Sequence, residues 1–101
     1  MKTLIIIARD SMIQELKTLL HDHGITAYSI LHNVEGTGRT GTVSGTFFYP
    51  GINCIILAMI SSDQADRAIH ALQQLHAARA QTSHGQVAPL KVFSFPCEEH
   101  L

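Results

Sequence analysis

Two uninterrupted apolar runs constrain the fold of this chain more than any other feature. Leu4–Ala8 is wholly apolar, Ile52–Ile60 is almost wholly apolar, and polar residues bound both runs. Runs of this length with many β-branched residues are typical of strands that are buried on both faces. The first run is too short for the apolar region of a signal peptide or for a membrane span, so we expect a cytoplasmic protein.

A helical pattern follows each run. The sequence predicts helices over Ser11–His23, which Gly24 ends in a left-handed conformation, and from Ser61 to about Arg79. Each helix is expected to begin with a capping box, at Ser11–Gln14 and at Ser61–Gln64. The apolar stripe of the second helix consists of Ala65, Ala68, Ile69, Leu72 and Leu75.

Two further strands complete the pattern. Ile25–Leu31 is rich in β-branched and aromatic residues, and Leu90–Phe95 alternates before Pro96 ends it. Residues 80–89 show no periodicity and are expected to form a loop. The order β-α-β-β-α-β predicts one α+β domain over residues 1–101, a ferredoxin-like βαββαβ sandwich with a four-stranded antiparallel sheet and two helices on one face.

The two predicted helices cannot cover both faces of the predicted sheet. Two helices cover only one face, whereas Leu4–Ala8 and Ile55–Ile60 are apolar on both. Another copy of the same sheet is the expected cover of the second face, so we predict a homo-oligomer.

The segment Val34–Gly51 contains five of the seven glycines of the chain. Its centre, Glu35–Gly41, places Arg39 between glycines. Closely spaced glycines bring backbone N–H groups near a ligand, and the guanidinium of Arg39 suits phosphate or carboxylate. The sequence leaves two interpretations open, an anion-binding loop and a hairpin loop in which the glycines only turn the chain. Phe47–Tyr49 within it is either a partner-docking tip or a flap on a neighbouring subunit.

The net charge, the spacing of the histidines and the number of cysteines argue against several classes of function. The formal net charge of -1 and seven scattered Lys and Arg residues argue against nucleic-acid binding. His21 and His23, like His70 and His76, lack the spacing of a helical metal chelate, so no metal site is expected. Two distant cysteines suggest reduced thiols rather than a disulfide or zinc site. No nucleophile motif or carboxylate pair is present, so no catalytic residue and no enzyme activity are expected.

The combined motifs resemble the PII and PII-like signalling proteins over nearly the whole chain. Gly36–Gly41 is similar to the Gly-x-Gly-Arg element at the base of the PII T-loop, and Lys91–Pro96 is similar to the closing Lys-Ile-Phe-x-x-Pro strand. The opening strand and helix and the strand around Ile55–Ile60 carry the rest of the match. The resemblance implies a homotrimer whose sheets face inward, with adenine nucleotide in three clefts between subunits and a short T-loop at residues 34–51 that regulates a partner transporter or enzyme.

The resemblance also implies the binding residues. The residues expected to contact nucleotide or anion are Gly36, Thr37, Gly38, Arg39, Thr40, Lys91, Ser29 and Gly85. Residues 80–89 correspond to the B-loop, but Ala88–Leu90 replaces the Gly-Asp-Gly of the family. This departure favours ADP or AMP over ATP. Shortened PII-like relatives are tied to inorganic carbon and carboxysomes, so bicarbonate near Arg39 is a reasonable second ligand.

Two other functions compete with a nucleotide sensor. One is a PII-like or CutA-like adaptor that binds no nucleotide and is linked to metal tolerance. The other is a small acylphosphatase-like enzyme on the same fold. Neither a separate cofactor nor insertion into a membrane is expected in any of these cases.

Overall fold

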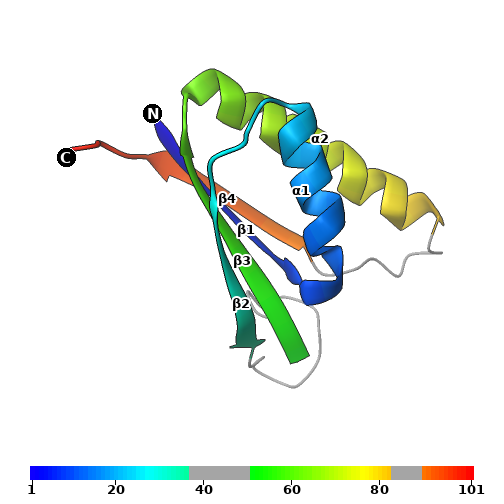
Figure 1. Cartoon of the computed structure of the whole chain (residues 1–101). Coiled ribbons are helices and arrows are strands. Elements are labelled where there is room, and N and C mark those ends of the chain that lie inside the picture. Colours follow the sequence, from blue (N-terminus) through cyan, green and yellow to red (C-terminus); the bar gives the residue numbers. More distant parts are fainter. Residues whose placement is uncertain (37–50, 83–89) are drawn as a thin grey trace.

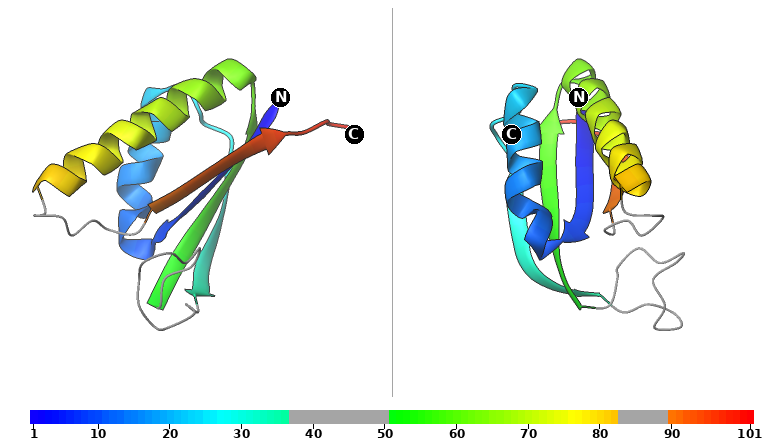
Figure 2. Two further views of the ribbon diagram at one scale, coloured as in Figure 1. Left: turned by 180° about the vertical axis from the view of Figure 1, so that it is seen from behind. Right: turned by 90° about the vertical axis from the view of Figure 1, so that its right-hand side faces the viewer.

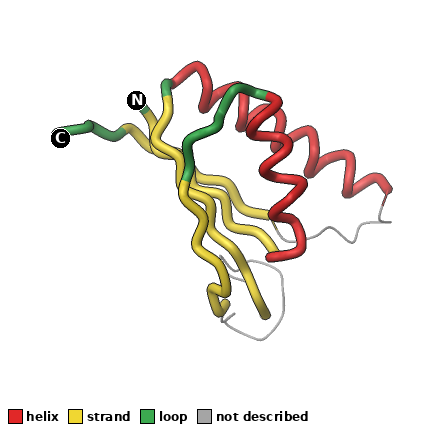
Figure 3. The backbone as a smooth tube through the Cα atoms, in the orientation of Figure 1, coloured by secondary structure: helices red, strands yellow, loops and turns green. Residues whose placement is uncertain are grey.

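The computed structural model describes residues 1–36, 51–82 and 90–101. In chain order the elements are β1 (Lys2–Arg9), a short 3-10 helix (Asp10–Met12), α1 (Ile13–Asp22), β2 (Ser29–Gly36), β3 (Gly51–Ile60), α2 (Ser62–Thr82) and β4 (Leu90–Pro96) (Figures 1 and 3). β1, β3 and β4 are slightly longer than predicted. Ala80, Gln81 and Thr82, expected in the loop over residues 80–89, belong to α2.

The described strands form one antiparallel sheet in the order β2-β3-β1-β4. Both helices lie against the same face of this sheet, as Figure 2 shows in its right-hand view. The predicted ferredoxin-like βαββαβ fold is confirmed.

The core lies between the helices and this face. Alternate residues of the two central strands point into it, and each is at most 8% exposed. These residues are Leu4, Ile6 and Ala8 of β1 and Cys54, Ile56, Ala58 and Ile60 of β3. The helices contribute Ile13, Leu16 and Leu20 from α1 and Ala65, Ala68 and Leu72 from α2. The apolar stripe predicted for the second helix therefore faces the sheet.

The first helix begins differently from the prediction but ends as predicted. Asp10–Met12 forms a 3-10 turn, and no side chain caps the N-terminus of α1, so the capping box expected at Ser11 is wrong. Met12 and Ile13 are buried there, and their burial fixes the entry of the chain. At the other end Gly24 takes φ +77°, and the Ile25 N–H donates to the Leu20 carbonyl at 2.9 Å. This is a Schellman motif, with Ile25 packed into the core.

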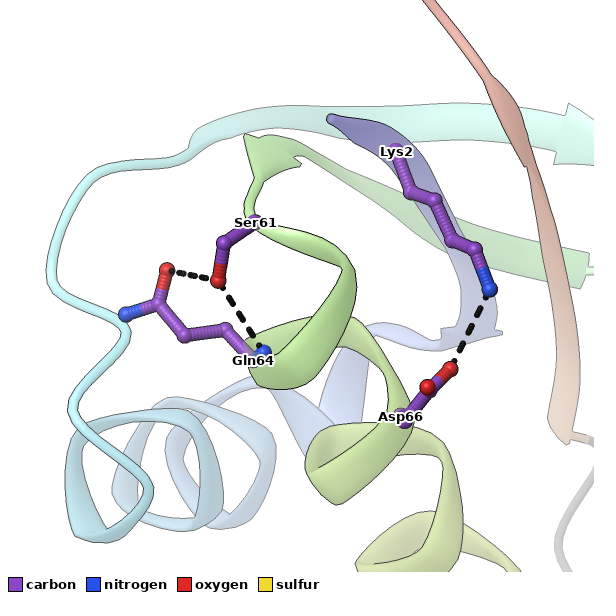
Figure 4. A network of polar contacts seen from close by, with 4 residues as sticks. All are labelled: Lys2, Ser61, Gln64 and Asp66. Carbon is purple, nitrogen blue, oxygen red and sulfur yellow. Dashed lines mark hydrogen bonds and ion pairs between the residues drawn. The ribbon is translucent and has the colours of Figure 1, made fainter.

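The capping interaction predicted at the second helix is present. The Gln64 N–H donates to Ser61 Oγ at 3.1 Å, and the Ser61 hydroxyl donates to Gln64 Oε1 at 3.3 Å (Figure 4). Lys2 of β1 pairs with Asp66 of α2 at 3.1 Å in the same view. Arg79 of α2 pairs with Glu15 of α1. Ion pairs therefore connect α2 to both β1 and α1.

The second strand is where the sequence prediction fails most. A strand over Ile25–Leu31 was expected, whereas β2 begins at Ser29 and continues to Gly36. Val34–Gly36 and Gly51, expected in the loop over residues 34–51, therefore lie in β2 and β3. The Ile25 N–H closes the C-terminus of α1 by its hydrogen bond to the Leu20 carbonyl. The Tyr28 hydroxyl forms a 3.0 Å hydrogen bond with Nε2 of His21 on α1. The apolar and aromatic residues before Ser29 therefore anchor the connection to α1 instead of pairing in the sheet.

Candidate functional site

The face of the sheet opposite the helices, here called the open face, is covered by no described element. The register and the strand alternation place on it Thr3, Ile5, Ile7 and Arg9 of β1, Ser29, Leu31 and Val34 of β2, Asn53, Ile55, Leu57 and Met59 of β3, and Lys91, Phe93 and Phe95 of β4. Most of these side chains are apolar. Met59 is 58% exposed and Phe95 is 47% exposed, whereas Thr3, Ile7 and Asn53 are already buried in the single chain. A contiguous apolar surface of this kind marks an interaction site.

One end of the sheet collects the strand ends that border the two segments outside the described residues. Gly36, the last residue of β2, pairs with Gly51, the first of β3, and Ala8 pairs with Leu90 at the start of β4. We call this the loop end. Both chain termini lie at the opposite end, where the Cys97 N–H donates to the Met1 carbonyl at 3.2 Å (Figure 1).

A β-bulge lies just before the loop end in β2. Leu31 pairs with Ile55, but Val34 pairs with Asn53, so β2 has one residue more than β3 over this stretch. Asn33 in the bulge takes φ 57°, a left-handed conformation. The fully buried Asn53 donates from Nδ2 to the Val34 carbonyl at 3.3 Å and fastens the strand beyond the bulge.

The left-handed conformation of Asn33 in the bulge leads to a testable prediction. Replacement by Val is expected to destabilise the fold by about 1–2 kcal/mol, because a β-branched residue is strained at positive φ. Replacement by Gly, which adopts this conformation freely, is expected to have little effect. Urea unfolding at equal protein concentration measures both. An equal loss with Gly and Val would mean that the amide side chain, rather than the backbone conformation, supports the bulge.

Three of the predicted site residues lie within the described part of the chain. Gly36 is buried at the loop end, Lys91 is half-buried on the open face opposite Ile7, and Ser29 lies on the same face opposite Leu57. Ser29 and Lys91 belong to the two outer strands. With two strands between them and about 4.8 Å per step, they lie about 14 Å apart or more. A single chain therefore does not bring Ser29 and Lys91 together. Thr37, Gly38, Arg39, Thr40 and Gly85 lie outside the described residues.

Arg9 is a candidate that the sequence prediction missed. It was treated as the polar boundary of the first apolar run, but it is the last residue of β1 and pairs with Asn53. Strand alternation places it on the open face with Ile7 and, diagonally, Lys91. Extending the predicted strand by one residue would have placed Arg9 on the same face as Ile5 and Ile7.

Cys54 and Asp10 are titratable groups near the loop end that face away from the open face. Burial, and secondly the nearby Asp10 carboxylate, raise the pKa of the Cys54 thiol. Asp10 lies 3.7 Å from Nδ1 of His32 on β2. In residues 1–36, 51–82 and 90–101, no group of three or more His, Cys, Asp or Glu side chains is arranged to hold a metal ion. Among the helices of this part of the chain, none has the length and apolarity needed to cross a membrane.

Comparison with known proteins gives a family and a set of similar folds. The family model of nitrogen regulatory protein P-II matches residues 1–100. No curated protein sequence matches the chain. A PII-like signalling protein from Thermus thermophilus has a similar structure, with a TM-score of 0.66 and 17% identity over 93% of this chain and 83% of that one.

Two structures of the PII-like protein CPII from Thiomonas intermedia K12 are also similar. One, bound to ADP, AMP and acetate, has a TM-score of 0.64 and 17% identity, covering 97% of this chain and 88% of that one. The other, bound to ADP, AMP and bicarbonate, has a TM-score of 0.62 and 18% identity, covering 99% of this chain and 94% of that one. At such identities the likeness shows a shared fold.

Proposed function

This chain belongs to the nitrogen regulatory protein P-II family, and from that membership we propose that it is a homotrimeric regulatory protein without enzyme activity. It binds adenine nucleotide in clefts between subunits, ADP or AMP in preference to ATP, together with a small anion such as bicarbonate. It regulates a partner transporter or enzyme through the segment that contains residues 37–50.

The main support for the proposal is the apolar character of the open face. It is apolar, no described element of the chain covers it, and Phe93 and Phe95 lie on its outer strand. Three copies that pack these faces together remove this surface from water. The same packing supplies what one chain lacks, because Ser29 of one copy and Lys91 of another lie on opposite outer strands and meet only across a subunit boundary.

Ligand chemistry also supports binding of adenine nucleotide and a small anion. CPII has been solved with ADP, AMP and bicarbonate bound. In this chain the predicted contacts are Gly36–Thr40, Lys91, Ser29 and Gly85, a set with backbone N–H groups, hydroxyls and two cations for a phosphate. The sequence Ala88–Leu90 replaces a glycine-rich phosphate-binding loop, which favours ADP or AMP over ATP.

Isothermal titration of the purified protein with AMP, ADP and ATP, each with and without bicarbonate, tests the proposal. We expect about one nucleotide per chain, and at roughly 100 times the dissociation constant about 2.7 kcal/mol of added stability per site. Arg39→Ala is expected to remove most of this stabilisation. Arg67→Ala, which removes an exposed cation from α2, is the matched control.

The outcomes separate the competing functions. Unchanged affinity in Arg39→Ala would place the site elsewhere. No binding of any nucleotide to the wild-type trimer would favour an adaptor that uses the same assembly without a ligand. Release of phosphate from an acyl phosphate would contradict the non-enzymatic assignment.

A further inference from the structure

Three sulfur-containing side chains gather at the end of the open face that carries both chain termini. Met1, Met59 and Cys97 line one surface cavity of about 390 Å³ there, together with Thr3 and two glutamates. A second cavity beside it is again lined by both methionines. Met1 and Met59 are exposed and Cys97 is half-buried, so none of the three is used up in the core of the domain.

The register of the sheet explains why these residues lie together. The β1–β4 ladder continues past its last pair, because the Cys97 N–H donates to the Met1 carbonyl at 3.2 Å. Residues that face each other in this way have Cα atoms about 5.5 Å apart and side chains on the same face. Thr3 pairs with Met59, which makes Met1 and Met59 diagonal neighbours about 7–8 Å apart, within reach of long side chains. Met1 therefore lies between the other two sulfur-containing residues.

One thiol and two thioethers form a donor set for a soft metal ion. Cysteine binds metal as the thiolate, and the methionine sulfur is a polarisable, uncharged ligand. Sulfur ligands of these two kinds select copper(I), whereas carboxylates suit magnesium, calcium and manganese. The prediction that the chain has no metal site rested on the spacing of histidines and cysteines, in which methionine plays no part.

The glutamates of the cavity do not change this preference. The carboxylate of Glu98 is exposed and lies 3.6 Å from Nε2 of His100, so water and an imidazole already surround it. Among the described residues that line the cavity there is no histidine. The sulfur atoms are therefore the donors that decide which metal ion the cavity suits.

The charge of the complex also favours copper(I). The cavity opens on the face that the proposed trimer covers, so an ion bound here is partly removed from water. Copper(I) with one thiolate and two thioethers carries no net charge, which avoids the cost of an unpaired buried ion. A divalent ion with the same ligands would keep one positive charge.

We propose that Met1, Met59 and Cys97 form a copper(I) site at the end of the sheet that carries the chain termini. The Cys97 thiolate supplies the negative charge, and the two thioethers complete a shell of three sulfur ligands. Binding releases the thiol proton to water and leaves the copper and the sulfur atoms in their oxidation states. The site is separate from the nucleotide site of the proposed function and does not depend on it.

Anaerobic titration of the full chain with copper(I), in competition with a coloured copper(I) chelator, tests the proposal. We expect one copper(I) per chain, an ultraviolet charge-transfer band from thiolate to copper, and three sulfur neighbours in the copper X-ray absorption spectrum. Zinc(II), titrated against a zinc chelator, should bind more weakly than copper(I).

Two matched pairs of variants test the named ligands. Cys97→Ala is expected to abolish binding, and Cys54→Ala, which removes the other cysteine, is its control. Met59→Leu keeps an apolar side chain of similar volume, and Met12→Leu, at a buried methionine of the core, is its control. Loss of a group that only orients a metal ligand costs about 10- to 100-fold in affinity, so loss of Met59 itself should cost at least this much. Both controls should bind copper(I) as the wild type does.

Three results would overturn the inference. The first is a wild-type protein that does not retain copper(I) against the chelator, and the second is tighter binding of zinc(II) than of copper(I). The third is wild-type affinity with an unchanged number of sulfur neighbours in Met59→Leu, which would mean that cysteine alone captures the ion. If Cys97→Ala does not assemble, Met59→Leu decides, because its sulfur neighbours must fall from three to two while Met12→Leu keeps three.

Discussion

Replacing Ile5 by Glu is expected to convert the assembled protein into separate 11.1 kDa chains. Ile5 lies on the central strand β1, between Leu57 of β3 and Phe93 of β4, at the middle of the open face. In a trimer whose open faces meet, the introduced carboxylate would be buried in every copy among Leu57 and Phe93. Pairing with Lys91, its diagonal neighbour on β4, would offset only part of the cost of taking both charges out of water. The effective penalty is several kcal/mol per ion, and a trimer incurs it in each of its three copies.

Sedimentation velocity at micromolar concentration measures this effect. The wild type should sediment as three copies and Ile5→Glu as one. Ala77→Glu, which places the same charge on an exposed position of α2, should remain trimeric. A wild-type protein that sediments as a single chain would refute the role assigned to the open face.

Leu16→Ala is expected to cost about 2–5 kcal/mol of unfolding free energy. Leu16 is fully buried on α1 and belongs to the cluster between the helices and the sheet. Truncation leaves a cavity that the surrounding residues fill only in part. A domain of this size has a total stability of roughly 5–15 kcal/mol, so the loss is a large fraction of it.

Urea unfolding of Leu16→Ala must be compared with the wild type at equal protein concentration, since subunit association adds to the apparent stability. Leu101→Ala is the matched control, because Leu101 is fully exposed at the end of the chain. A loss below about 1 kcal/mol for Leu16→Ala would mean that the core collapses around the missing side chain.

The fold was predictable because its core strands and helices have strong local signals. The runs at Leu4–Ala8 and Ile52–Ile60 became the central strands β1 and β3, and the helical stripe that includes Ala65 and Leu72 faces the sheet. The predicted start of β2 was wrong because Ile25 and Tyr28 have the residue types of a strand. They are used to close the end of α1 and to contact it, a tertiary role that local pattern does not reveal.

The candidate site was predictable only in part. The family motifs pointed to Lys91 and Gly36, which the structure places toward one end of the sheet, but they also grouped them with Ser29 on the far outer strand. No local pattern shows that two such residues can meet only between copies. The bulge at Asn33 was also not visible, since it depends on the register of β2 against β3. The assignment of Arg39 remains a prediction.

The strand order has a consequence for the synthesis of the protein. β1 is made first, yet it occupies an interior position between β3 and β4, and Lys2 pairs with Pro96 near the other end of the chain. At roughly 5–20 residues per second, the ribosome needs several seconds to supply the last neighbour of β1. During this time the edge of β1 that pairs with β4 has no partner from this chain, so Leu4–Ala8 completes its pairing only after β4 has been made.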